Sequence, residues 1–548
     1  MQRSVTLLGW MLLGGCLVAA GCAPSPQRED TLARLPAAEQ ILSIEAVGLR
    51  GEAAPPVLKR LLGDPSLVVR AQAAQLLAAV AADRGPGLAL AALTHEDPLV
   101  RGIAQASYIE HHPYGMAPVV VDGRVAEDPP YVLEALARLG DPHGRVDLDE
   151  VIADHRATLR EALEAEPETA VLAADILARI GDAGARRRLL LLAEEAEGQV
   201  LAKAVRAAVR HRMGLGPTLL PLACQRSLAG RRAAMRALVA SPDPRLQMLL
   251  RRGLRDNDTA VRRNAIRAMG NLGAAAPVRL LAEFLERGDR GTTADALGAL
   301  GVIGRPAEDV LREYIRTSGA GPELQVRAMM ALAPNAGRQD IPWASARLAS
   351  DDTYVRAAAA SVLGRIGHPE SQAALVEACD DPEPLVRAAV AKALGQVGTI
   401  YAANHLLDML DDPSPLVASM AAWGLGATGW LDAAPALIEV CTSHDSSGGV
   451  PVRVGEMYAR PELAATEALG RIRSEEGRQA LRTALEADAW RIRAAACDAL
   501  RIAADRSEES VAALEKRLDD PVRAVAAHAL AALEALGKTY EPGAFQAE

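Results

Sequence analysis

The stretch DDPEPLVRAAVAKALGQVG, residues 380–398, decides the fold because close copies of it recur along the chain. One copy is SDDTYVRAAAASVLGRIG, residues 350–367, which repeats an acidic turn, a Val-Arg pair and an Ala-rich segment ending in glycine. The two arginines, Arg356 and Arg387, lie 31 residues apart. A period of this length is typical of arrays built from stacked supersecondary units. The chain is therefore expected to fold as one repeat array rather than as several unrelated domains.

Each copy of the repeat keeps the same pattern around its arginine. Counting from the arginine, positions −1, +3, +6 and +7 are apolar or small, and this spacing forms one stripe of an α-helix. Glycine at +8, often with another at +11, is expected to end that helix. The Asp-Pro turn before it suits a helix start, and a further amphipathic helix precedes the turn. The same arginine recurs at Arg70, Arg101, Arg262, Arg356, Arg387, Arg493 and Arg523.

This unit resembles the HEAT repeat, in the short bacterial form related to phycobilisome lyase repeats. The resemblance rests on the Asp of the turn, the Val-Arg pair and the Ala-Leu-Gly helix end, and it is clearest at residues 64–110, 256–303 and 350–430. It implies an all-α fold, an α-solenoid of about 14–16 stacked HEAT-like helical pairs. The recurring Asp and Arg are then expected to form an Asp–Arg ladder between neighbouring turns rather than a catalytic site.

Composition agrees with an all-α fold and argues against nucleic-acid binding. Aromatic residues are only 3% of the chain, so the core must be built from Ala, Leu, Val and Ile, which favours close packing of helices. The formal net charge is −10, whereas a general nucleic-acid binder needs a basic surface. No nucleic-acid partner is therefore expected.

The first thirty residues indicate export and a lipid anchor. Residues 1–21 are typical of a signal peptide, with Arg3 before an apolar run that is short for a membrane span. Its end resembles the lipobox of bacterial lipoproteins, at Cys16 or at Cys22. A polar, Pro-containing tether, residues 22–30, follows the second cysteine, so lipidation of Cys22 is favoured. An ordinary signal cut after an A-x-A-like site is the alternative.

The anchor determines the expected location of the protein. The lipoprotein resemblance implies several acyl chains on Cys22, enough for stable anchoring in a bacterial membrane. Ala23, rather than Asp, follows the cysteine, which favours the outer membrane over the inner. Residues 31–538 would then form the solenoid and residues 539–548 a C-terminal tail.

Two insertions interrupt the repeat period, near residues 110–130 and 441–462. The first contains VVVDGRV, an Asp-Gly turn between strand-forming residues, which predicts a small hairpin. Its neighbouring His111 and His112 cannot easily share one metal, and no metal site is expected. The second is rich in Gly and Ser, and long loops in compact arrays are either functional or disordered.

Partner-binding residues are sought at position +5 of the repeat, because this column is expected to point away from the apolar stripe and it varies between copies. Divergent side chains on a rigid scaffold could give specificity for a partner, and an unconstrained solvent position would vary equally. Trp423 favours binding, since exposed tryptophan is a common interface anchor. The candidate residues are Trp423, Lys392, Ser361, Arg267, Asp498 and His528.

The sequence therefore predicts a non-enzymatic scaffold or adaptor that is lipid-anchored at the bacterial envelope and binds proteins on the concave face of a solenoid. No cofactor is expected beyond the covalent lipid on Cys22. Two alternatives remain open. One is a phycobilisome-lyase-like enzyme or chromophore-handling protein, although export argues against it because that substrate is cytosolic. The other is an envelope assembly factor or chaperone for unfolded clients.

Overall fold

The computed structural model describes two compact units. One, the N-terminal unit, holds the described residues up to 137 and from 142 to 306; the other, the C-terminal unit, holds 138–141 and the residues from 307 onward. The predicted signal peptide, Cys22 and the tether lie outside the described residues, as does the tail from residue 540. The described residues are 35–47, 54–112, 115–121, 123–139, 141, 144–196, 198–211, 213, 228–240, 247–273, 276–317, 319–443, 452–454 and 457–539.

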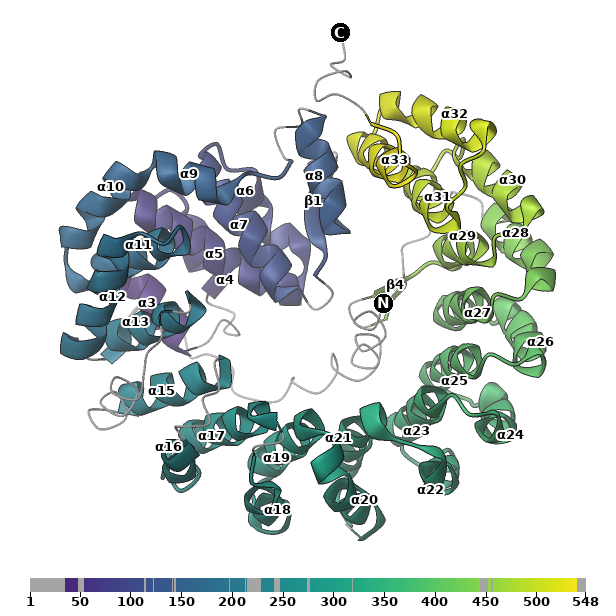
Figure 1. Ribbon diagram of the computed structural model, residues 1–548, viewed down its shortest axis with the longest axis horizontal. Helices are drawn as coiled ribbons and strands as arrows, with labels where there is room; N and C mark the ends of the chain where they lie inside the picture. The colour runs from purple at the N-terminus through teal and green to yellow at the C-terminus, as the bar shows by residue number, and fades with distance from the viewer. Residues whose placement is uncertain are drawn as a thin grey trace. The chain divides into compact units, whose positions relative to one another are not determined.

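The C-terminal unit is a stack of helical pairs. Figure 1 shows the second helices of these pairs along its inner edge and the first helices along its outer edge. The first helices are α20 (Glu308–Thr317), α22 (Ile341–Arg347), α24 (Gln372–Glu377), α26 (Ile400–Asp408), α28 (Ala434–Ser443), α30 (Glu475–Ala484) and α32 (Glu508–Lys516). The second helices are α21 (Pro322–Leu332), α23 (Thr353–Ile366), α25 (Pro384–Val397), α27 (Pro415–Thr428), α29 (Pro461–Ile472), α31 (Trp490–Ala503) and α33 (Arg523–Ala535). Each second helix packs against the next, so the predicted α-solenoid is confirmed in this unit.

The N-terminal unit contains the same pairs in a less regular order. Its N-terminal helix α3 packs against α5, α11 and α13. The helices of this unit are α3 (Ala37–Val47), α4 (Ala54–Leu61), α5 (Leu67–Arg84), α6 (Leu90–Leu93), α7 (Pro98–His111), α8 (Pro130–Arg138), α9 (Leu148–Asp154), α10 (Arg156–Glu161), α11 (Pro167–Arg179), α12 (Ala183–Glu195), α13 (Gly198–Arg210), α15 (Leu228–Ala240), α16 (Gln247–Gly253), α17 (Thr259–Asn271), α18 (Val278–Arg287) and α19 (Arg290–Ile303). Alanine, leucine and valine supply most of its buried side chains, as the composition predicts.

Both insertions contain strands. The first forms the predicted hairpin, in which β1 (Ala117–Val121) pairs antiparallel with β2 (Arg124–Asp128), and Gly123 in the turn has φ +70°. The second was expected to be a loop, but its described residues include β3 (Val452–Val454) paired antiparallel with β4 (Met457–Ala459). Its alternating β-branched residues allow pairing once a turn brings them together. In the part of the chain that the structure describes, no helix has both the length and the hydropathy needed to cross a bilayer.

The predicted Asp–Arg ladder is confirmed. Arg387 extends from α25 to the turn before α27, where its Nε and Nη2 donate to the two carboxylate oxygens of Asp412 at 2.7 and 3.0 Å. Its Nη1 donates back to the carbonyl of Asp381 in its own turn at 2.8 Å. The arginine therefore joins two successive turns, with its planar fork matched to a carboxylate. The same pairing joins Arg356 to Asp381, Arg493 to Asp520 and, at 3.4 Å, Arg70 to Asp97.

The two glycines of the repeat have different roles. Gly367, Gly398 and Gly429, at position +11, end their helices in the left-handed region with φ between +61° and +71°, as predicted. The expectation that the +8 glycine also caps the helix is wrong. At Gly395 a Cβ atom would lie 2.4 Å from the Cα of Gly424 on the next helix. The +8 glycine lies inside the helix because neighbouring backbones meet there.

Replacing Gly395 by alanine should therefore push α25 away from α27 and lower the free energy of unfolding by about 1–3 kcal/mol, the usual range for overpacking a core. The matched control is Gly298→Ala in α19, where the new Cβ meets nothing within 4 Å. That change should raise stability by about 0.5–1 kcal/mol because alanine favours a helix interior. Urea unfolding of both variants measures the two effects, and equal effects would contradict the close contact.

Candidate protein-binding surface on the second helices

The candidate surface is a row of side chains, one from each of six successive second helices of the C-terminal unit. We call it the inner strip. It follows position +5 of the repeat, and α29 contributes Glu467 at the corresponding place. Its members are Ser361 on α23, Lys392 on α25, Trp423 on α27, Glu467 on α29, Asp498 on α31 and His528 on α33. Four of them, Ser361, Trp423, Glu467 and Asp498, are not buried.

Trp423 lies near the middle of the strip and is half-buried. The guanidinium of Arg471, on α29, lies 6.0 Å from the centroid of its indole ring, within range of a cation–π contact. Glu467 accepts a hydrogen bond from Arg471 at 2.5 Å and so fixes the arginine in place. The tryptophan is therefore held on one side by a neighbouring helix and keeps part of its ring accessible.

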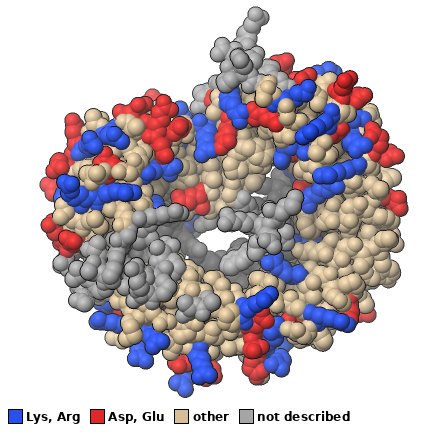
Figure 2. Space-filling model, viewed as in Figure 1, with Lys and Arg blue, Asp and Glu red and all other residues tan. Residues whose placement is uncertain are grey.

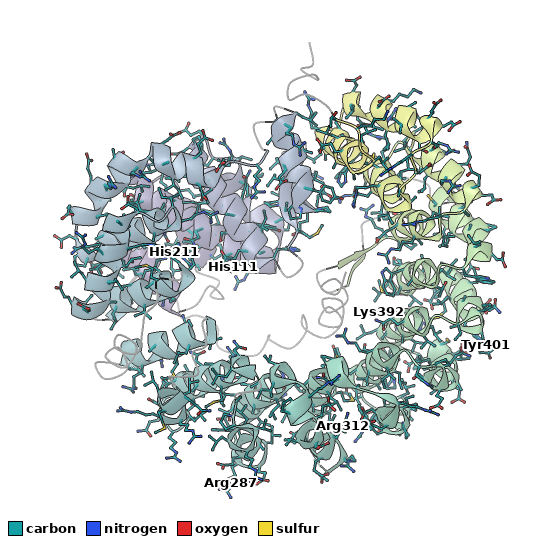
Figure 3. All side chains as sticks on the ribbon, viewed as in Figure 1. His111, His211, Arg287, Arg312, Lys392 and Tyr401 are labelled. Carbon is teal, nitrogen blue, oxygen red and sulfur yellow. The ribbon has the colours of Figure 1, made fainter. Side chains whose placement is uncertain are left out.

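Lys392 is buried at 7% exposure, contrary to the expectation that its column points to solvent. Figure 3 shows it on the inner edge of α25. Neighbouring second helices approach so closely that position +5 lies between them, where their long side chains shield one another. Burial and the charge of Arg365 lower the pKa of Lys392 to about 8. Ser361, at the same place on the preceding helix, donates its hydroxyl to the carbonyl of Ala357 at 2.9 Å.

The C-terminal end of the strip carries an acid–base contact. Nδ1 of His528 lies 3.0 Å from a carboxylate oxygen of Asp498, and Arg501 lies 3.4 Å from the other oxygen. His528 is buried at 2% exposure, so the expectation of a solvent-facing residue is wrong for it as well. The two candidates are therefore brought together, and His528 contributes to packing of α33 on α31 rather than to an open surface.

Arg267 is the one candidate outside this unit. It lies on α17 of the N-terminal unit, where its Nε and Nη2 donate to Asp295 of α19 at 3.0 and 2.8 Å. Asp295 occupies position +5 of its own repeat and is buried, again contrary to the solvent expectation. Because Arg267–Asp295 and Asp498–His528 both join position +5 of neighbouring repeats, the column is a second lateral ladder. The paired charges at position +5 therefore stabilise the packing of neighbouring repeats.

The N-terminal unit contains a further member of this lateral ladder that sequence analysis missed. The carboxylate of Asp175, on α11, is 2% exposed and lies 2.8 Å from Nζ of Lys203 on α13. Arg210 lies 2.8 Å and His211 2.9 Å from the same carboxylate. Burial alone would raise the pKa of Asp175, but the charges of Arg210 and Lys203 and the hydrogen bond from His211 lower it well below its usual range. The signal was present in AADILARIG, residues 173–181, which matches AASVLGRIG, residues 359–367, with Asp in place of Ser.

Two clefts in the described residues are small. One cleft, of about 60 Å³, adjoins the Asp175 cluster and is bordered by Arg210 and His211. This volume has room for about two waters. Another, of about 230 Å³, lies between Arg262 and Phe284. Neither is the deep apolar pocket typical of a substrate site.

The first insertion uses its histidines for packing. His112 stacks on Tyr108 with ring centroids 5.7 Å apart, and its Nε2 lies 3.3 Å from Glu127 of β2. The Tyr108 hydroxyl donates to the same Glu127, so the hairpin is attached to α7. His111 makes a 2.8 Å contact from Nδ1 to the carbonyl of Ser107. Within the described ranges, no three His, Cys, Asp or Glu side chains are grouped as a metal site requires.

Charge is mixed rather than segregated over the visible face of each unit. Figure 2 shows Lys and Arg interspersed with Asp and Glu. Many of these charges are paired across repeats, as Arg312 of α20 is with Asp340 at 3.0 Å. A field of one sign large enough to attract nucleic acid is not visible on this face.

Sequence comparison identifies the repeat. A family model for HEAT repeats matches residues 216–301, 341–426 and 459–534. A model for the PBS lyase HEAT-like repeat matches residues 417–443, which span α27 and α28. A search of curated proteins found no significant match.

Solved structures give distant matches. Yeast importin-beta (Kap95p) matches with 14% identity and a TM-score of 0.44, over 97% of this chain and 72% of its own. The CpcE–CpcF complex of phycocyanin lyase from Nostoc sp. matches with 20% identity and a TM-score of 0.30, over 47% of this chain and 94% of its own. At such identities and TM-scores, neither protein indicates a partner or activity for this chain.

Proposed function

We propose that this chain, which matches the HEAT-repeat model at residues 216–301, 341–426 and 459–534, binds another protein along the inner strip while a lipid on Cys22 holds it at a bacterial membrane. In this proposal the chain is a scaffold or adaptor and performs no chemistry of its own. Export and outer-membrane attachment belong to the same proposal and rest on the sequence of residues 1–30.

The observation that carries the proposal is the half-buried Trp423, supported by Arg471 on a rigid stack of helices. Tryptophan and arginine are, with tyrosine, the residues enriched at binding hot spots. The backbone beneath them is fixed by the Asp–Arg ladder, so a partner would meet a preformed surface. The residue type in the strip also changes from each helix to the next, so a partner with complementary side chains could be distinguished from other proteins.

Chromophore attachment is a second candidate because the PBS lyase HEAT-like repeat model matches residues 417–443, which include Trp423. We place it second because the match covers a single repeat of a common scaffold and the predicted export separates the chain from a cytosolic substrate. A visible absorbance retained after mixing the protein with a bilin would favour this activity. Binding of many denatured proteins, regardless of Trp423, would instead favour a chaperone.

The test is a cross-linking pull-down from membranes with four variants. Cys22→Ser should move the protein from the membrane fraction to the soluble fraction, and Cys16→Ser should leave it at the membrane. Trp423→Ala should lower recovery of the specific partner by about tenfold or more, the usual effect of a hot-spot tryptophan. The matched control is Trp490→Ala, which removes a half-buried tryptophan of the same unit that lies away from the strip, at the start of α31.

The outcomes separate the two parts of the proposal. A captured set that is the same for Trp423→Ala, Trp490→Ala and the wild type would refute binding at the strip. A Cys22→Ser variant that stays in the membrane fraction would refute the anchor, whatever the pull-down shows.

A further inference from the structure

The two units contain the same local arrangement with one difference. Lys203 lies in AKAV, residues 202–205, and Lys392 in AKAL, residues 391–394. Each lysine lies on a second helix, next to the helix that carries the AADILARIG or AASVLGRIG segment. The residue at the shared place on that helix is Asp175 in the first case and Ser361 in the second. Lys203 and its surroundings therefore show how a buried lysine at this place of the repeat is neutralised, and Lys392 can be compared with it.

The reference lysine is paired. Nζ of Lys203 lies 2.8 Å from the carboxylate of Asp175, and it also donates to Gln72 at 3.1 Å. Both partners of the ion pair are almost fully buried, at 1% and 2% exposure of the side chain. A carboxylate on the preceding second helix thus offsets the free-energy cost of burying a lysine at this place.

Lys392 lacks that group. It is 93% buried, and it has neither a hydrogen bond nor an ion pair with any of the described residues. The nearest charge that acts on it is a second cation, Arg365, which repels it. The depressed pKa of about 8 reflects this shortage of negative charge. Nζ of Lys392 is not among the fully enclosed polar atoms that lack a hydrogen-bond partner, so it keeps contact with solvent and a partner can reach it. A largely buried lysine without a counter-charge is costly, and it favours a ligand that supplies one.

We propose that Lys392 is the anchor for a carboxylate of the partner, supplied by an acidic segment of polypeptide that lies along the inner strip. This inference rests on the proposed function and names the chemistry of its partner. The acidic side chain takes the place that Asp175 occupies beside Lys203, between Ser361 and Trp423. The charge of Arg365 acts on Lys392 and adds to the positive potential at this lysine, which favours an acidic segment over a neutral one.

The neighbouring side chains suit a peptide. Ser361 is smaller than the aspartate at the corresponding place of the reference unit, and it is not buried. Trp423, the next member of the inner strip after Lys392, offers an apolar ring for the residue next to the acid. The close approach of α25 and α27 at Gly395 and Gly424 fixes the lysine and the tryptophan relative to one another.

The decisive variant is Ser361→Asp, which restores the internal pair seen at Asp175 and Lys203. It should raise the pKa of Lys392 and occupy the place of the ligand carboxylate. The probe is a fluorescent N-acetylated hexaglutamate peptide, followed by anisotropy, with hexaglutamine as the neutral counterpart. We expect the wild type to bind hexaglutamate, and both Ser361→Asp and Lys392→Met to bind it about tenfold or more weakly. The control Arg338→Met removes a paired, 69% exposed arginine near the start of α22 and should bind as the wild type does.

A stability measurement keeps the test independent of weak peptide affinity. Because the pKa of Lys392 is lower in the folded chain than the unfolded value of about 10.4, its burial destabilises the protein fully below pH 8. That penalty should disappear as the pH rises from about 8 to about 10.4. The stability difference between Lys392→Met and the wild type should shrink over this window, and the same difference measured in the Ser361→Asp background should not.

The proposal is overturned if hexaglutamate binds the wild type and Ser361→Asp equally, or if inorganic phosphate competes as well as a carboxylate does. Loss of the cellular partner in Trp423→Ala but not in Ser361→Asp would leave the strip as a binding surface and refute carboxylate recognition alone. Loss in both variants supports the two proposals together.

Discussion

Asp520→Ala should lower the free energy of unfolding of the C-terminal unit by about 3–5 kcal/mol, among the largest effects of any single substitution in the ladder. The carboxylate of Asp520 is fully buried and accepts hydrogen bonds from Nε and Nη2 of Arg493, both at 2.8 Å. Its removal leaves the arginine, whose side chain is only 10% exposed, without its counter-charge. It also removes the acceptor for the backbone N–H of Val522 at the start of α33.

Glu475→Ala is the control that separates the effect of burial from the loss of an ion pair alone. Glu475 pairs with Arg478 at the surface, where their side chains are 68% and 30% exposed. Water and salt screen exposed pairs such as this one, so the variant should remain close to the wild type. Urea unfolding of the two variants gives the comparison, and a double-mutant cycle with Arg493→Met gives the coupling energy of the buried pair. Losses of similar size in the two variants would contradict the role of the ladder.

The ladder itself could be predicted from the sequence because it depends on periodicity. A charge that recurs at one place in every repeat has the same neighbours each time, so Arg387 and Asp412 could be paired before their coordinates were known. The same holds for the left-handed glycines, although two of the described helices reach the left-handed region without glycine. Arg473 and Ala504 adopt φ of +61° and +53° at that position, a conformation that costs more for a residue with a side chain than for glycine.

The burial of position +5 could not be predicted in the same way. A helical wheel separates an apolar stripe from a polar one but does not say how close the neighbouring helix comes. That distance depends on pairs of small residues such as Gly395 and Gly424, and Gly395 is at the +8 position that was expected to cap its helix. Once the helices meet there, Lys392 and His528 lie between backbones rather than in solvent. The partner of each charge is then set by the next repeat, as Asp498 is for His528.

Asp175→Ala should lower the free energy of unfolding of the N-terminal unit by about 3–5 kcal/mol because it removes the buried carboxylate that pairs with Lys203, whose side chain is only 1% exposed. Arg210 and His211 lose the same acceptor, although they can reach water through the neighbouring cleft. The matched double variant Asp175→Leu with Lys203→Met removes both charges and should recover most of the loss, since a buried ion pair is often replaceable by apolar residues of similar size.

The pH dependence of this effect has a definite sign. The pKa of Asp175 in the folded chain lies well below its unfolded value of about 3.9, so its contribution is fully present above that value. The stability difference between the wild type and Asp175→Ala should therefore be constant from about pH 7 to 5. Below about pH 4 the unfolded chain takes up a proton that the folded chain does not, and the difference should shrink as the pH approaches the folded pKa. A difference that grows below about pH 4 would mean that Asp175 is protonated in the folded chain, which is incompatible with its contacts to Lys203 and Arg210.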